Sequence, residues 1–183
     1  MRKLIIGSIL CLFIIFVVKT LSYMEKKHKE NEKVVKTLLG KEIALSGLVF
    51  TKIGKDTVDY YINQYEYKVF TYLRPSECVS CNLRLYAWKN YIEENKAALS
   101  KRVGYIFYYQ VNNTNDIQYF LEKENFEYPV CIDLKGKLGV ISELPQGIQY
   151  QTFLLNKENK IIAVGNPVVN SSVKQFYQSI MEK

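Results

Sequence analysis

The sequence predicts an α/β fold preceded by an N-terminal transmembrane helix, and three observations support this prediction. Apolar and aromatic runs of strand length alternate with segments of helical periodicity after about residue 65. Two apolar runs flank a short polar stretch at 156–159, which is typical of a β-hairpin. A nearly uninterrupted apolar run follows Arg2 and Lys3, as expected of a segment that enters a membrane.

Length and composition indicate one domain with a tail. The chain has 183 residues, of which 48% are apolar, so it can bury a hydrophobic core. The net charge is +7, but basic and acidic residues are mixed along the chain without an arginine-rich stripe. Nucleic acid is therefore not an expected partner. Four cysteines are too few for a disulfide scaffold.

Residues 1–23 are interpreted as an uncleaved membrane anchor that contacts lipid. Residues 4–18 form the apolar run, which as a helix would span about 22 Å of the roughly 30 Å hydrocarbon core. Extension to Tyr23 reaches about 30 Å, with Lys19 reaching toward the headgroups. The segment is thus long enough to cross a bilayer once.

Two alternatives to an anchor remain open. A cleaved signal peptide would need small residues before the cut, and residues 20–22 match weakly. A lipoprotein signal would make Cys11 the lipidated residue, but Leu10 before it is bulky and the apolar run continues. Arg2 and Lys3 favour a cytoplasmic N-terminus, while the lysines after the run favour the reverse. We expect the domain on the extracytoplasmic, periplasmic side, where a disulfide can persist.

Residues 24–39 read as a charged helical stalk, and the folded domain is expected at 40–183. Lysines in the stalk alternate with glutamates, which favours a solvated helix over a lipid-binding patch. His28 is the only histidine, so it is interpreted as a surface residue rather than a metal ligand.

The domain is expected to begin with short strands at 43–51 and 57–62 around a turn at 54–56. Tyr67–Leu73 is the first clear strand, followed by a helix over 82–94. Val103–Val111 is apolar and aromatic almost throughout, as in a central strand covered on both faces.

The second half continues the alternation. Residues 112–116 are turn and cap material, and Ile117, Phe120 and Leu121 then have helical spacing. A short strand is expected at 128–133, a loop or short helix at 135–142, and a hairpin of strands 151–155 and 160–164. The final helix is predicted to have N-cap candidates at 170–172, a capping box of Ser172 with Gln175, and a buried stripe. The stripe comprises Val173, Phe176, Tyr177, Ile180 and Met181.

Cys78 and Cys81 form a CxxC pair between a predicted strand and a predicted helix. Cys81, Leu85, Trp88 and Ile92 are spaced along one helical face, so the pair is expected at the helix N-terminus. Unpaired amides and the positive end of the helix dipole would stabilise the Cys78 thiolate there. Cysteines in such positions have pKa values of roughly 3.5 to 7.5, against about 8.5 for a free thiol.

The order β-α-β-α-β-β-α with CxxC after the first strand resembles the thioredoxin-like superfamily, and most of all its membrane-tethered, TlpA-like or redoxin-like branch. The likeness covers roughly residues 65–183 and includes Tyr128-Pro129-Val130 before Asp133 and the hairpin at 152–162. It implies a central mixed sheet with helices on both faces. It also implies that Cys78 attacks and Cys81 resolves, that no organic cofactor is needed, and that protein thiols and disulfides of the cell envelope are partners.

The chain departs from this family at four places. Glu77 stands where the family has tryptophan before the first cysteine, and Val79-Ser80 replaces the common Gly-Pro. Tyr150 stands where the family has a cis-proline, so a trans peptide is expected. Tyr72 occupies the strand position of the family's buried acid.

Other interpretations of the cysteines remain. The pair can be a static structural disulfide in a non-catalytic binding module of the envelope, or part of a metal site, although no second CxxC exists to complete tetrahedral zinc. Cys131 is expected to be a buried thiol, with exchange against the pair as its alternative. Trp88 is expected in the core.

Overall fold

The computed structural model describes residues 2–75, 83–99, 101–136, 139–141 and 143–182, without the side chains of residues 2–12 and Asp116. By its contacts the chain divides into two units, Met1–Leu38 and Leu39–Lys183. The two units are described separately. The predicted boundaries at 23 and 39, which assign roles to an anchor and a stalk, stay predictions.

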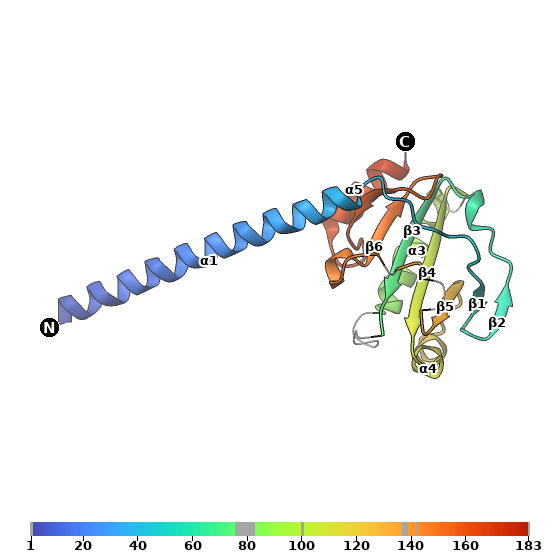
Figure 1. Cartoon of the computed structure of the whole chain (residues 1–183), viewed down its shortest axis with the longest axis horizontal. Helices are drawn as coiled ribbons and strands as arrows, with labels where there is room; N and C mark the ends of the chain where they lie inside the picture. Colours follow the sequence, from blue (N-terminus) through green and yellow to red (C-terminus); the bar gives the residue numbers. More distant parts are fainter. Residues whose placement is uncertain (1, 76–82, 100, 137–138, 142, 183) are drawn as a thin grey trace. The chain divides into compact units, whose positions relative to one another are not determined.

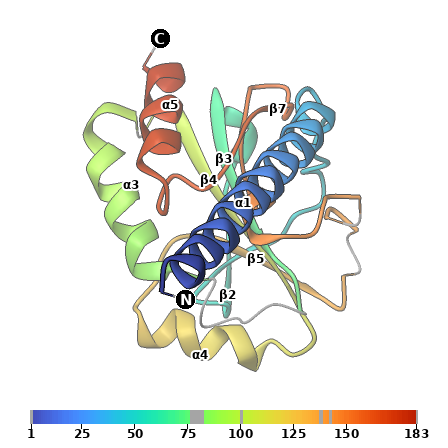
Figure 2. The ribbon, with the colours of Figure 1, turned by 90° about the vertical axis from the view of Figure 1, so that its left-hand side faces the viewer.

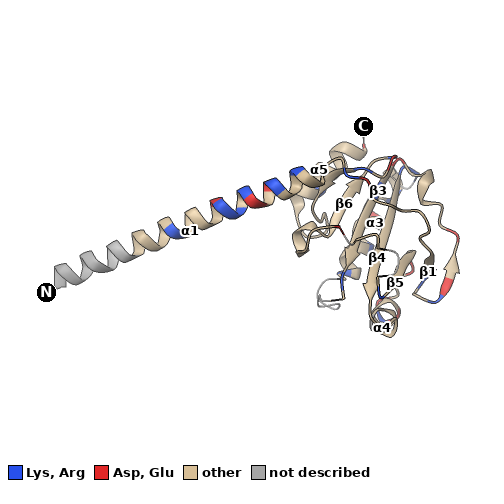
Figure 3. Cartoon of the chain, viewed as in Figure 1, with Lys and Arg blue, Asp and Glu red and all other residues tan. Residues whose placement is uncertain are grey.

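The first unit is one helix, α1 (Arg2–Leu38). Charged side chains of both signs follow one another along its second half (Figure 3). Ion pairs spaced four residues apart, Glu25 with Lys29 and Glu32 with Lys36 at 2.7 Å each, support the helix. Within the residues that the structure describes, no helix is both long enough and apolar enough to cross a membrane. The transmembrane segment therefore stays a prediction.

The second unit is built on a sheet of seven strands in the order β2-β1-β5-β4-β3-β6-β7 (Figure 1). β3, β4 and β5 are parallel, and the remaining pairings are antiparallel, so the sheet is mixed as expected. The strands are β1 (Phe50–Lys52), β2 (Asp56–Val58), β3 (Tyr67–Leu73), β4 (Val103–Val111), β5 (Val130–Leu134), β6 (Thr152–Leu155) and β7 (Ile161–Val164).

One face of the sheet packs against helices. The helices are α3 (Leu85–Leu99), α4 (Asn115–Lys123) and α5 (Ser171–Met181), and α3 and α5 lie on the same side of the sheet (Figure 2). Alternate strand residues such as Val69, Phe107 and Leu154 join the helices in one hydrophobic cluster. Trp88 of α3 is 1% exposed and lies in this cluster, as predicted.

The other face carries buried aromatic side chains. Phe70, Tyr72, Tyr108 and Phe153 have ring centroids 5.9 to 6.3 Å apart in successive contacts. Irregular chain after β5, together with the short 3-10 helix η2 (Ile148–Tyr150), contacts this face. Among the described residues of this unit, α3, α4 and α5 all belong to the first face. The expectation of helices on both faces is therefore met on one face only.

Several element boundaries differ from the sequence predictions. β3 and β4 have the predicted bounds, and the hairpin of β6 and β7 is confirmed. The expected strand at 43–51 is wrong except for its end at β1, and β2 ends before the 3-10 helix η1 (Ile62–Gln64). Short edge segments such as these have too few alternating residues for pattern to fix their limits.

At α5 one of the predicted N-cap candidates, Asn170, is confirmed, whereas the capping box at Ser172 and the start of α3 are wrong. Asn170, not Ser172, caps α5, since its side-chain oxygen accepts hydrogen bonds from the backbone N–H groups of Ser172 and Val173. Phe176 is 55% exposed, so it does not belong to the buried stripe. α3 begins at Leu85, and Leu83 and Arg84 before it are not helical, so the predicted start at residue 82 is wrong.

Candidate functional site

The predicted site residues Cys78 and Cys81 lie outside the described residues. The structure describes both sides of the segment that carries them. β3 ends at Leu73, two described residues follow, and the chain is described again from Leu83 into α3. The segment thus connects the carboxyl end of a central parallel strand to a helix. At that edge of an open α/β sheet, ligands commonly bind.

The late start of α3 changes the electrostatic argument for the cysteines. Leu85 is four residues after Cys81, and Arg84 between them has a left-handed backbone with φ of +46°. The sequence pattern had predicted Cys81 on one face of this helix. The described helix α3 begins only at Leu85, so it does not include Cys81. The free amides of α3 begin farther along the chain than the pair.

A groove of about 280 Å³ lies beside Arg84. Its walls come from three places: the start of α3, the chain around η2, and the turn from β7 into α5. We call it the Arg84 groove, and its lining residues are Arg84, Ile148, Gln149, Gln151, Gly165, Asn166, Val169, Asn170 and Val173. Of these, the sequence singled out Asn170, as a cap, and Val173, as part of the buried stripe of the final helix, and it predicted no binding role for any of them. The others are far apart in the sequence, and no motif joins them.

The absence of a side chain at Gly165 allows the backbone in the wall of the groove to pass close to Val173 of α5. Its φ is +128°, and a Cβ there would meet the Val173 side chain at 3.0 Å. Its backbone is held on both sides, because its N–H donates to the Thr152 carbonyl at 2.9 Å and its carbonyl accepts from the Tyr177 hydroxyl at 2.8 Å. A residue with a side chain would be strained and crowded at this position.

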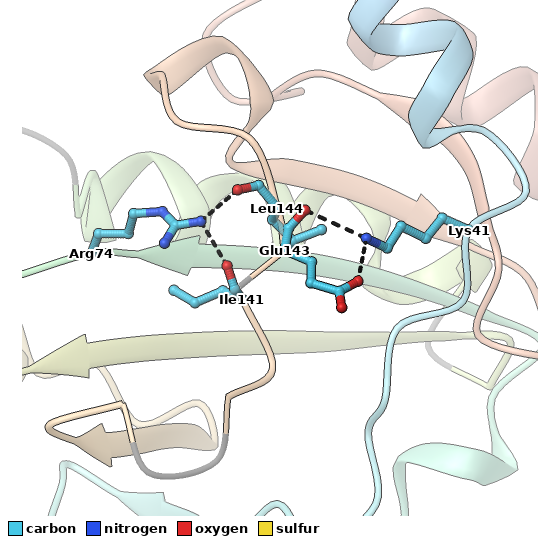
Figure 4. Close-up of polar contacts among 5 residues, drawn as sticks. All are labelled: Lys41, Arg74, Ile141, Glu143 and Leu144. Atoms are coloured by element: carbon cyan, nitrogen blue, oxygen red, sulfur yellow. Dashed lines mark hydrogen bonds and ion pairs between the residues drawn. The ribbon is translucent and has the colours of Figure 1, made fainter.

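Arg74 fastens the chain that follows β5 to the end of β3 (Figure 4). Its Nη2 donates to the carbonyls of Ile141 at 2.7 Å and Leu144 at 2.8 Å. At the other side of the same segment, Lys41 forms an ion pair with Glu143 at 2.9 Å. Because Arg74 precedes Cys78 by four residues, these bonds fix one end of the cysteine-bearing segment. The sequence pattern does not indicate this role of Arg74.

No protein-family model and no curated protein matches the chain. Its fold is similar to several solved structures. A candidate thiol:disulfide interchange protein DsbE from Chlorobium tepidum superposes with a TM-score of 0.58 at 16% identity, over 78% of this chain and 97% of that one. The chain has a thioredoxin-like fold.

Two further structures agree. The thioredoxin domain of a thiol-disulfide oxidoreductase from Bacteroides vulgatus gives a TM-score of 0.53 at 14% identity, over 75% of this chain and 96% of that one. A thiol:disulfide interchange protein from a Bacteroides species gives 0.51 at 13% identity, over 76% and 90%. The predicted thioredoxin-like resemblance is therefore confirmed at the level of the fold.

A trans peptide bond was expected before Tyr150, at the position where the family that the chain resembles has a cis-proline. The peptide bond before this residue is trans, as predicted, since the described residues contain no cis peptide bond. Tyr150 is only 6% exposed, so its ring is buried and does not form part of the protein surface. Gln151 next to it pairs with β3, where its carbonyl accepts the Tyr72 N–H at 2.9 Å.

Buried polar side chains on β3, β4 and β5 are paired by hydrogen bonds. Tyr72 is buried and donates its hydroxyl proton to the Pro145 carbonyl at 2.8 Å. On the neighbouring strand, the Tyr108 hydroxyl donates to Asp133 of β5, and both residues are buried. Burial, reinforced by the hydrogen bond to the Asp133 carboxylate, raises the pKa of Tyr108, so the phenol stays protonated.

Metal ligands do not gather in the part of the chain that the structure describes. No group of three His, Cys, Asp or Glu side chains lies close enough there to hold an ion. Cys131 is a buried free thiol on β5, as predicted. Burial raises its pKa to about 11.

Proposed function

We propose that this thioredoxin-like protein exchanges thiols and disulfides with partner proteins through Cys78 and Cys81. The observation that carries this proposal is the position of the CxxC segment, which joins the carboxyl end of β3 to α3 in a thioredoxin-like fold. The similar structures include proteins named as thiol-disulfide oxidoreductases and interchange proteins. Their activity supports the proposal, and it agrees with the resemblance to the TlpA-like branch.

In the reductive direction, the Cys78 thiolate attacks one sulfur of a partner disulfide. A mixed disulfide forms, and the other partner sulfur leaves as a thiolate that takes up a proton. The Cys81 thiolate then attacks the Cys78 sulfur and releases the second partner thiol. The partner has gained two electrons, and the protein holds a Cys78–Cys81 disulfide. A dithiol reductant must return it to the starting state, and the reverse sequence oxidises a partner dithiol.

Two arginines flank the cysteine segment and favour the thiolate. Arg74 precedes Cys78 by four residues, and Arg84 follows Cys81 by three. Covalent geometry keeps the Cα atoms of Arg84 and Cys81 within about 11 Å of each other. Positive charges near a thiol lower its pKa, and this effect supplements the amides of α3, which begin only at Leu85. Glu77 beside Cys78 acts in the opposite direction.

We also propose that residues 1–23 anchor the protein in a membrane, with residues 40–183 on the extracytoplasmic side. The apolar run behind Arg2 and Lys3 and the presence of a cysteine pair support this arrangement. A reporter enzyme that is active only outside the cytoplasm, fused after Lys183, tests it. Activity of the reporter together with membrane fractionation of the fusion is expected; a cytoplasmic reporter signal would refute the location.

A single pair of measurements tests the exchange function. Equilibration with glutathione buffers should give a Cys78–Cys81 reduction potential of about −120 to −270 mV, the range of exchanging pairs. The Cys81→Ser variant should accumulate mixed disulfides with partner proteins that vanish on reduction, and the matched Cys78→Ser variant should accumulate far fewer. If the Cys81→Ser variant accumulates no mixed disulfides, the proposed exchange function is refuted.

A second candidate function is a non-catalytic binding module with a static disulfide. The residues that favour it are Tyr150, with a trans peptide where the family has cis-proline, and Tyr72 in place of the family's acid. A reduction potential below about −300 mV would select this alternative, because such a bond resists the glutathione pool.

A further inference from the structure

The Arg84 groove is electropositive and rich in hydrogen-bond donors. Its lining contains one guanidinium and four side-chain amides, and no carboxylate is among the lining residues that the structure describes. Asn166 and Asn170 both use their side-chain oxygens within the protein. The Asn166 oxygen accepts the Val168 N–H at 3.0 Å, and the Asn170 oxygen accepts those of Ser172 and Val173. Their NH2 groups are left as donors, so the groove favours a ligand that carries acceptors.

Arg84 differs from the other arginines whose side chains are described. Arg102 forms an ion pair with Glu66 at 2.7 Å, and Arg74 donates to two carbonyls. Within the described residues, the Arg84 guanidinium has neither an ion pair nor a hydrogen bond. The side chain is exposed, and its backbone has a φ of +46°, which is unfavourable for a residue with a Cβ. Such strained positions cluster at functional sites.

Apolar side chains complete the groove. Ile148 is 49% exposed and Val169 is 51% exposed, and both line the cavity. They come from two different segments of its lining, the chain at η2 and the turn before α5. An aliphatic side chain of a ligand could cover both residues and remove their apolar surface from water.

We propose that the Arg84 groove binds an extended segment of the partner protein that carries an acidic side chain close to its reactive cysteine. Arg84 pairs with that carboxylate, and the asparagine amides donate to the carboxylate or to the peptide carbonyls. Arg84 is thus the residue that determines specificity. This inference rests on the proposed exchange function and adds the class of substrate to it: disulfides in acidic sequence surroundings.

Two peptide probes test this inference with the full chain in its reduced form. Each probe is a disulfide-linked dimer of a short peptide with one cysteine, flanked by aspartates in the first probe and by lysines in the second. The rate at which the protein reduces each probe is divided by the rate at which dithiothreitol reduces it. This division corrects for the different intrinsic reactivity of the two disulfides. The wild type should reduce the aspartate probe about three- to tenfold faster than the lysine probe, and added salt should diminish this ratio.

Variants at the two ends of α3 separate a local effect from a general one. Arg84→Gln should bring the ratio close to one, Arg84→Glu should invert it, and Arg84→Lys should retain part of it. Lys101→Gln removes the same charge at the far end of α3 and should leave the ratio unchanged. Circular dichroism and the thermal midpoint confirm that each variant is folded.

The outcomes are distinguishable from failure of the exchange function. If the wild type reduces neither probe, exchange itself is refuted. If it reduces both probes equally fast and Arg84→Gln changes nothing, exchange stands and the acidic specificity is overturned. A preference that Arg84→Gln and Lys101→Gln reduce to the same degree would also overturn it, because net charge and not the groove would then be responsible.

Discussion

Cys131 shows how the burial of one residue fixes its chemistry. It is 1% exposed on β5, where it pairs in register with Tyr108 of β4. Burial raises its pKa from 9.0 to about 11, and the Asp133 carboxylate acts in the same direction. Since the thiolate is the reactive species, this thiol is held in its inert form. Its position argues against a role as a third exchanging thiol.

A variant in which the other three cysteines are replaced by serine should show this inertness directly. At pH 8 the native Cys131 should react with iodoacetamide at least about 100-fold more slowly than in the urea-unfolded chain, because a shift from 9.0 to about 11 lowers the thiolate fraction about 100-fold. The rate should keep rising toward pH 11. Equal rates in the folded and unfolded chains would show that Cys131 is accessible.

The same pKa shift has a consequence for stability. Between pH 9 and about pH 11 the unfolded chain loses the Cys131 proton while the folded chain retains it, so stability falls as the pH rises through this window. Below pH 9 both states keep the proton, and this thiol contributes no pH dependence.

Among the elements, the segment between β5 and η2 is the one most dependent on side-chain hydrogen bonds. It contains no strand and no long helix in its described part, and Arg74 and Tyr72 bind its carbonyls from β3 and just beyond. Two apolar side chains of this segment, Ile141 and Leu144, are buried. Irregular chain on a sheet face stays in place only if its carbonyls find donors.

Removal of the Arg74 guanidinium should therefore loosen this segment. Arg74→Met should lower the free energy of unfolding by about 2–3 kcal/mol, because two part-buried carbonyls lose a charged donor. Hydrogen exchange at the Leu144 amide, which bonds the Ile141 carbonyl at 3.2 Å, should accelerate. Urea unfolding and exchange measured by mass spectrometry check both effects.

Lys41→Met serves as the matched control, since it removes a contact from the same segment. The Lys41–Glu143 pair is solvated, with the glutamate side chain 81% exposed, so its loss should cost at most about 1 kcal/mol. If Lys41→Met lowers the free energy of unfolding as much as Arg74→Met does, the proposed importance of the two carbonyls bound by Arg74 is disproved.

At the scale of the whole molecule, Leu39–Lys183 contains its own core and sheet. The start of this unit is tied to the hairpin, because the Gly40 N–H donates to the Ile161 carbonyl at 2.8 Å and the Ile43 N–H to the Asn159 carbonyl at 2.9 Å. These bonds lie within the unit, and none of them requires the preceding helix.

A chain that starts at Leu39 should therefore fold by itself. Its free energy of unfolding should equal that of the full chain within about 1 kcal/mol, because the sheet and its hydrophobic cluster are retained. Urea titration followed by tryptophan fluorescence reports on this, since Trp88 is 1% exposed in the core. A chain starting at Gly47 is the control, and it should be less stable because it lacks the bonds to the hairpin. An unfolded or aggregated Leu39–Lys183 chain would show that the unit depends on residues 1–38.

The sequence by itself determined the elements whose pattern is long and regular. Tyr67–Leu73 and Val103–Val111 were predicted with their correct limits, and the order of strands and helices indicated a thioredoxin-like fold. Apolar periodicity reports burial directly, so such strands and the buried side of α3 can be read from it. The CxxC pair is likewise visible in the sequence, and the redox proposal for it begins there.

Only the tertiary structure decided which distant residues share a site. Arg84, Gln151 and Asn166 meet in one groove because the sheet brings the start of α3, the chain before β6 and the turn after β7 to the same edge. Arg74 finds its carbonyl partners about 70 residues later in the chain, in a segment without periodicity. Polar contacts of this kind depend on the position and direction of single atoms, and the spacing of residue types along a chain does not encode these.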